Sequence, residues 1–70
     1  MNFNEKILNK YLGRKIIIRT RAGFAYTLIL RHENIEKNIL SFKNAKGELV
    51  CLDIGEITFI TTTKGLQLTL

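Results

Sequence analysis

The sequence predicts a mainly β fold, a small and strongly bent barrel of five strands with an N-terminal helix and an extra C-terminal strand. From Arg14 onward, apolar residues recur at every second position, which is the period of a half-buried strand. Glycine-containing turn signals separate these segments, and the 70-residue chain has no proline. Residues 1–70 are therefore expected to form a single domain.

The first predicted element is a helix over about residues 4–12. Asn4 is suited to cap its first turn, and Glu5 in that turn interacts favourably with the helix dipole. Gly13 follows the helix as a residue that readily adopts the left-handed conformation. The apolar residues at helical spacing, which predict one packed face, are Ile7, Leu8, Tyr11 and Leu12.

Five short strands are then predicted for the barrel, which spans about residues 14–61. The first two meet at a turn at Ala22-Gly23, and a polar loop from Asn34 to Asn38 leads into the third. Asn44–Gly47 reads as a hairpin turn, and Ile54-Gly55 separates the last two barrel strands. The predicted strand ranges are 14–21, 24–31, 39–43, 48–53 and 56–61, with the extra strand at about 66–70.

Strict alternation along these strands predicts which side chains face the core. The fourth strand is nearly continuous in apolar residues and is expected to be buried on both faces, so Cys51 is predicted to be a buried, inert thiol. Ile17 and Ile29 fall on the otherwise polar face, where the helix is expected to cover them. The predicted inward residues include Phe24, Tyr26, Leu28, Leu30, Leu40, Phe42, Ile57 and Phe59.

Positive charge is concentrated in the first half of the chain. The net charge is +5, yet residues 1–31 carry seven Lys/Arg against the single acid Glu5, and residues 32–70 carry four Lys/Arg against five acids. Such an asymmetry is typical of a protein with a polyanionic partner, and a solvated basic surface that only keeps the protein soluble is the alternative that stays open. Lys15, Arg19 and Arg21 occupy alternate positions of one strand, a spacing that can follow a phosphate backbone.

The polar loop after the second strand supplies a further set of candidates. Asn34 and Asn38 offer amide donors and acceptors that can read base edges, although asparagine also shapes turns. His32 is the only histidine and has no Ser or Cys nucleophile nearby, so we expect it to contact a ligand rather than to catalyse. Asp53 is expected to cap the turn at Ile54-Gly55. The candidate nucleic-acid-binding residues are Lys15, Arg19, Arg21, Arg31, His32, Asn34 and Asn38.

The order of these features resembles the Sm-like (LSm/Hfq-like) superfamily over roughly residues 5–61. The resemblance is carried by Leu12-Gly13, Ile16–Ile18, Gly23, Tyr26 and Asn38-Ile39-Leu40, with Asn34 four residues before Asn38. It implies an SH3-like barrel with an N-terminal helix, RNA binding, and rings in which the fourth strand pairs with the fifth strand of a neighbour. Where many members have a base-stacking residue, this chain has Glu36, so the resemblance does not itself supply a uridine pocket.

The sequence therefore predicts a non-enzymatic, cytoplasmic module that binds RNA in preference to DNA and forms a homo-oligomer, which the resemblance implies is a ring. The alternative is a protein-interaction or assembly module that acts through the edge strands of the barrel. A strand at Leu66–Leu70 would either block the ring-forming edge or rebuild it. No cofactor, metal or membrane partner is expected, because the single cysteine and single histidine cannot form a metal set and no apolar run is long enough to span a bilayer.

Overall fold

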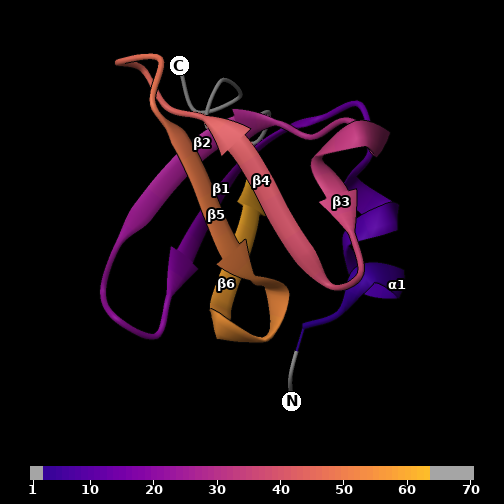
Figure 1. The fold of residues 1–70 in the computed structure, drawn as a ribbon. Helices are drawn as coiled ribbons and strands as arrows, with labels where there is room; N and C mark the ends of the chain where they lie inside the picture. The colour runs from indigo at the N-terminus through magenta and orange to yellow at the C-terminus, as the bar shows by residue number, and fades with distance from the viewer. Residues whose placement is uncertain (1–2, 64–70) are drawn as a thin grey trace, which may run out of the picture.

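Six strands and one short α-helix make up the fold of the computed structural model, which describes residues 3–63 (Figure 1). The predicted strand at about 66–70 lies outside the described residues. The elements in chain order are α1 (Glu5–Leu8), the 3-10 helix η1 (Asn9–Tyr11), β1 (Lys15–Thr20), β2 (Ala25–Ile29), the 3-10 helix η2 (His32–Asn34), β3 (Ile35–Glu36), β4 (Ile39–Lys43), β5 (Leu49–Asp53), the 3-10 helix η3 (Ile54–Glu56) and β6 (Ile57–Thr62).

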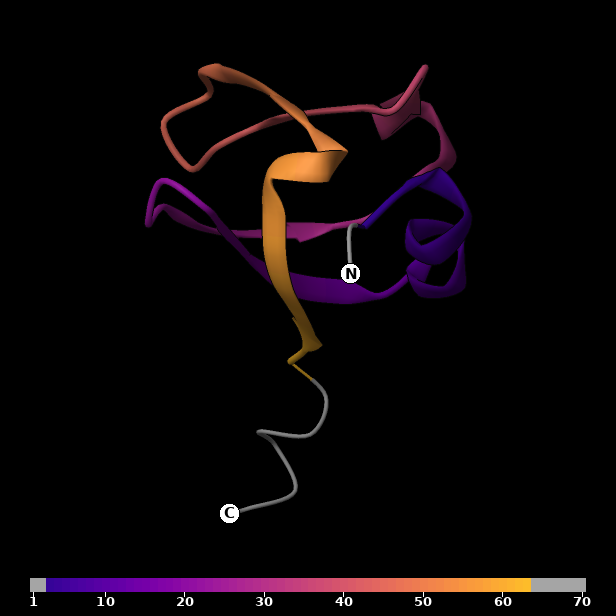
Figure 2. The ribbon, with the colours of Figure 1, turned by 90° about the horizontal axis from the view of Figure 1, so that it is seen from below.

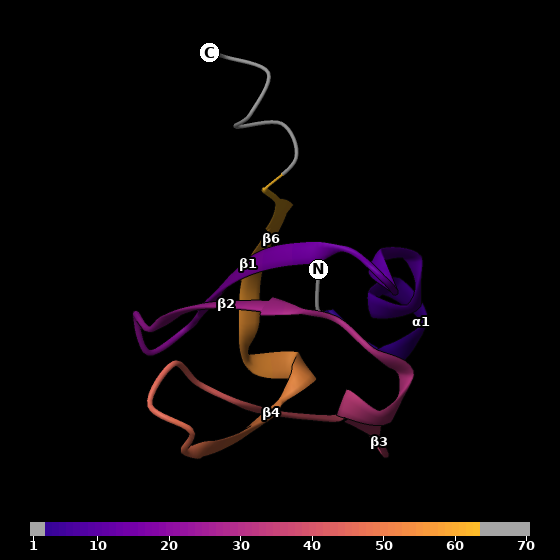
Figure 3. The same ribbon diagram turned by 90° about the horizontal axis from the view of Figure 1, so that it is seen from above.

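The strands form two antiparallel three-stranded sheets, in the orders β2-β1-β6 and β3-β4-β5. Two of the views show β1 and β2 in one layer and β4 in the other, with β6 crossing from the end of β5 to pair with β1 (Figures 2 and 3). The mainly β prediction is confirmed. Among residues 3–63 the strands remain in two sheets, and no closed barrel is found.

The core lies between the two sheets and consists of aliphatic side chains and one aromatic ring. Its buried members are Leu8, Ile16, Ile18, Leu28, Leu30, Leu40, Phe42, Ile54 and Ile57. Every second residue of β1 and of β4 enters this core, as the alternation predicts. No polar or charged residue among those described is buried, so the core contains no site.

The N-terminal helix is shorter than predicted but begins where expected. The Asn4 side chain accepts a hydrogen bond from the Ile7 N–H at 3.1 Å and so caps α1. After Leu8 the chain continues as a 3-10 turn, and Gly13 then reverses it with a φ of 83°. Leu8 is fully buried, so the helix closes one end of the core (Figures 1 and 3), while Ile29 stays 48% exposed. The expectation that the helix covers Ile29 is wrong.

The polar loop predicted at Asn34–Asn38 contains a strand that the sequence pattern did not reveal. β3 pairs with the start of β4, and Lys37 and Asn38 make the tight turn between them with φ values of 50° and 64°. Positive φ at both central residues is the geometry of a type I′ hairpin turn. This turn after β3 places Asn38 immediately before β4.

Four of the residues predicted to be buried are exposed, and each has a structural reason. Leu49 and Cys51 are exposed because β5 buries only one face and turns the other outward. Phe24 is 60% exposed because it lies in the β1–β2 turn, before β2 begins. Phe59 is 48% exposed because a β-bulge interrupts the β1–β6 pairing.

Candidate nucleic-acid interface

The outer face of the β2-β1-β6 sheet brings two of the predicted cations together. Residues paired across neighbouring strands share a face, so the register defines three cross-strand rows. Arg19 pairs with Ala25 and Phe59, Ile17 pairs with Thr27 and Thr61, and Lys15 pairs with Ile29. We call these residues the basic sheet face: Lys15, Ile17, Arg19, Ala25, Thr27, Ile29, Phe59 and Thr61.

Lys15 and Arg19 are the only ionisable residues of the basic sheet face, and both are exposed. Among residues 3–63 the one ion pair joins Arg21 to Glu56, so neither Lys15 nor Arg19 is neutralised by a described carboxylate. The two lie four residues apart on one strand, which corresponds to about 13 Å. The face therefore presents two separate positive charges with apolar and hydroxyl side chains between them.

Arg21 does not continue this row of charges. The pairing register shifts between Arg19 and Thr20, and Arg21 lies beyond the end of β1 beside η3. Its N–H donates to the Glu56 carbonyl at 2.8 Å, and its guanidinium Nη2 donates to the Gly55 carbonyl at 3.2 Å. An exposed ion pair with the Glu56 carboxylate at 3.8 Å partly offsets its charge. Arg21 thus links the β1–β2 turn to η3.

Arg31 and His32 are exposed where the chain leaves β2 and enters η2. The Leu30 N–H donates to the Arg14 carbonyl at 3.0 Å, which keeps this segment beside the start of β1. Arg31 therefore lies close to the Lys15 end of the basic sheet face. Both side chains are exposed, and their contact with a ligand stays a prediction.

Both predicted asparagines make hydrogen bonds within the fold. Asn34 Oδ1 accepts from the Arg31 N–H at 2.8 Å, and its Nδ2 donates to the Ser41 carbonyl at 2.9 Å. Asn34 therefore fixes η2 against β4 with both ends of its amide group. Asn38 Nδ2 donates to Asp53 Oδ1 at 3.2 Å, and the Asn38 carbonyl accepts from the Ile54 N–H.

Asp53 has the capping role that the sequence predicts. Its Oδ1 accepts from the Gly55 N–H at 2.8 Å and so caps η3. The same oxygen accepts from the Asn38 amide, which joins the β3–β4 turn to the β5–β6 connection. The Asn38–Asp53 pair is thus a structural link between two loops.

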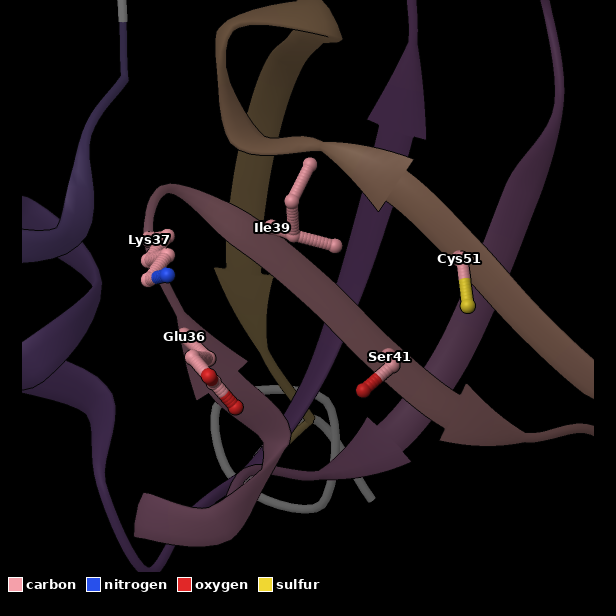
Figure 4. Close-up of a pocket in the computed structure, with 5 residues that line it drawn as sticks. All are labelled: Glu36, Lys37, Ile39, Ser41 and Cys51. Atoms are coloured by element: carbon pink, nitrogen blue, oxygen red, sulfur yellow. The ribbon is translucent and has the colours of Figure 1, made fainter.

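The outer face of the β3-β4-β5 sheet has a different character. A pocket of ≈ 280 Å³ on this face is lined by Glu36, Lys37, Ile39, Ser41 and Cys51 (Figure 4). Its two charges are opposite in sign, and Cys51 lies across from Ser41 in the register. The Glu36 carboxylate repels phosphate and cannot stack on a base, so this pocket does not favour a polyanion.

The sequence pattern missed Phe59 as an exposed aromatic. Alternation from Ile57 places Phe59 inward, but the bulge inserts Thr58 between Ile57, which faces Thr20, and Phe59, which faces Arg19. The Thr58 hydroxyl donates to the Arg19 carbonyl at 3.4 Å at this irregularity. No local sequence signal marks the bulge, because bulges depend on the partner strand.

Other classes of site lack support within the part of the chain that the structure describes. Residues 3–63 contain no group of three or more His, Cys, Asp or Glu that could hold a metal ion. None of their helices is long and apolar enough to cross a membrane. Comparisons with protein-family models, curated proteins and solved structures find no match to this chain, so the Sm-like resemblance stays a prediction.

Proposed function

We propose that this chain is a non-enzymatic module that binds RNA through the basic sheet face. The observation that supports this best is the pair of exposed cations, Lys15 and Arg19, on a face whose described residues include no carboxylate. Phosphate contacts of this kind supply sequence-independent affinity through the release of counterions. Arg31 and His32 extend the contact at the end of the face nearest Lys15.

RNA is the proposed ligand in preference to DNA. A sheet face with an exposed aromatic ring suits bases that are not stacked in a duplex, and specific recognition of RNA is mostly directed at such single-stranded segments. Asn38, held at the start of β4, is the candidate for a base preference. Asn34 supports the same loop from the side of η2.

The proposal includes an Sm-like barrel and a homo-oligomer. β5 and β6 are edge strands within the described residues, each paired on one side only. Pairing of β5 with β6 of a neighbouring subunit would satisfy both edges and close a ring. With its single cysteine, we assign the protein to a reducing cytoplasm.

A salt titration tests the proposed function. We expect binding to a mixed-sequence RNA pool to weaken steeply as salt rises, because each phosphate contact contributes about −0.7 to the slope of log K against log[salt] for single strands. The variant Lys15→Gln/Arg19→Gln should reduce this slope by about 1.4. Salt-insensitive binding, or no binding to RNA or DNA pools, would contradict the proposal.

A matched variant controls for the loss of net charge. Lys43 and Lys46 are exposed cations of β4 and of the β4–β5 turn, away from the basic sheet face. Lys43→Gln/Lys46→Gln removes the same charge and should leave the salt slope close to that of the unmodified protein. An equal loss of slope in both variants would show that net charge, rather than this face, determines binding.

A protein-interaction module is the second candidate, and the open edges of β5 and β6 favour it. An extended peptide could add to either edge as a further strand. This function predicts that a partner chain is captured while affinity for RNA stays negligible at every salt concentration. The salt titration therefore separates the two candidates.

A further inference from the structure

Phe59 is a large aromatic residue of β6 that lies on the outer face of its sheet. Ile57 is 1% exposed and Ile60 packs against the core, so the neighbouring apolar residues of β6 point inward. The bulge places Phe59 opposite Arg19 on the outer face, where 48% of its surface remains accessible. Leaving a phenylalanine half exposed forgoes part of the free energy that its burial would supply.

Phe59 and Arg19 lie together at a hollow in this face. The hollow measures ≈ 450 Å³, and Arg19 and Phe59 are the described residues that line it. Cross-strand partners have Cβ atoms about 5 Å apart, so the side chains of Arg19 and Phe59 leave the sheet from adjacent positions on the same face. The other partner of Arg19 is Ala25, whose small side chain leaves room on that side of the cation.

This combination matches the chemistry of one nucleotide. A planar aromatic ring stacks on any base, and an adjacent guanidinium contacts a phosphate. Thr27 and Thr61 lie in the next cross-strand row and add hydroxyl groups to the same face, Thr61 from the strand that carries the ring, and Lys15 lies one row further.

We propose that Phe59 stacks on an unpaired base while Arg19 and Lys15 contact the flanking phosphates, so that the protein selects single-stranded RNA over duplex RNA. This inference rests on the proposed function. It adds that the ligand is single-stranded RNA and that Phe59 recognises its bases. A base inside a duplex is already stacked on its neighbours and cannot reach a ring that lies on a sheet face.

Three RNA probes of equal length test the inference: a single strand, the duplex of the same sequence, and a strand with abasic riboses. The abasic strand keeps the phosphates and removes the bases. We expect the unmodified protein to bind the single strand roughly 5- to 150-fold more tightly than the abasic strand, which is the range for one base stacked on an aromatic ring. Phe59→Leu should bring this ratio close to one, and Phe59→Tyr should preserve it.

Phe24→Leu is the matched control, because Phe24 is also an exposed phenylalanine but lies outside the basic sheet face. It should keep the preference for the single strand. Equal affinity for the single and abasic strands, or a preference that survives Phe59→Leu, would overturn the inference while the proposed function stands. Failure to bind any of the three probes would overturn the proposed function as well.

Discussion

Asn34 shows how an amide that is suited to reading a base can instead hold the fold together. It is partly buried, its Oδ1 accepts from the Arg31 N–H, and its Nδ2 donates to the Ser41 carbonyl. Both ends of the amide are therefore engaged before any ligand arrives. Asn38 differs, because within residues 3–63 its side chain makes one hydrogen bond, through Nδ2, and its Oδ1 is left for a contact with a ligand.

The substitution Asn34→Ala should lower the free energy of unfolding by about 1–3 kcal/mol, because two backbone groups lose a partner in a part-buried site. Urea denaturation measures this loss, and Asn9→Ala, at an exposed asparagine of η1, is the control that should change stability little. The RNA affinity of the folded variant should remain close to that of the unmodified protein. Unchanged stability with a tenfold loss of RNA affinity would contradict the structural role and favour base reading.

The capping residues were predictable from the sequence because capping is local chemistry. Asn4 caps α1 and Asp53 caps η3, as the residues around them indicate. The exposure of Phe59 and Cys51 was not predictable in the same way. The exposure of each residue depends on the partner strand opposite it and on whether a second layer covers the outer face. The residues next to it in the sequence indicate neither of these.

At the scale of elements, the predicted strand positions agree closely with β1, β2, β4, β5 and β6. Regular alternation and the glycine-containing turns determine these segments. β3 was missed because it has two residues, too few for a visible period, and because Lys37-Asn38 is not the Asn-Gly pair that usually marks such a turn. The bulge in β6 was missed because the segment alone reads as regular.

The open edges of β5 and β6 lead to a prediction about assembly. Static light scattering without nucleic acid should give the mass of a hexamer or heptamer of the 8.1 kDa chain, because pairing of these edges around a ring satisfies their backbone groups. Removal of RNA with nuclease before the measurement is the control. A monomer or dimer mass would contradict the ring and give weight to the protein-interaction function.

At the scale of the whole molecule, the two sheets present two different outer faces. One carries Lys15 and Arg19 around an exposed aromatic ring, and the other carries a pocket with one acid and one lysine. The charge asymmetry of the sequence predicted a polyanion partner, but it could not say which face would receive it. That choice follows from the strand register, which turns Arg21 toward η3 and brings Phe59 beside Arg19.

The most direct test of RNA binding by the basic sheet face is an amide chemical-shift map of the protein during titration with a short single-stranded RNA. We expect the largest shifts at Lys15–Arg19 of β1 and at Phe59–Thr61 of β6, with smaller shifts at Arg31, His32 and Asn38. The amides of Glu36, Ser41 and Cys51 on the opposite sheet should change little. Largest shifts on that opposite sheet, or no shifts at saturating RNA, would contradict the account.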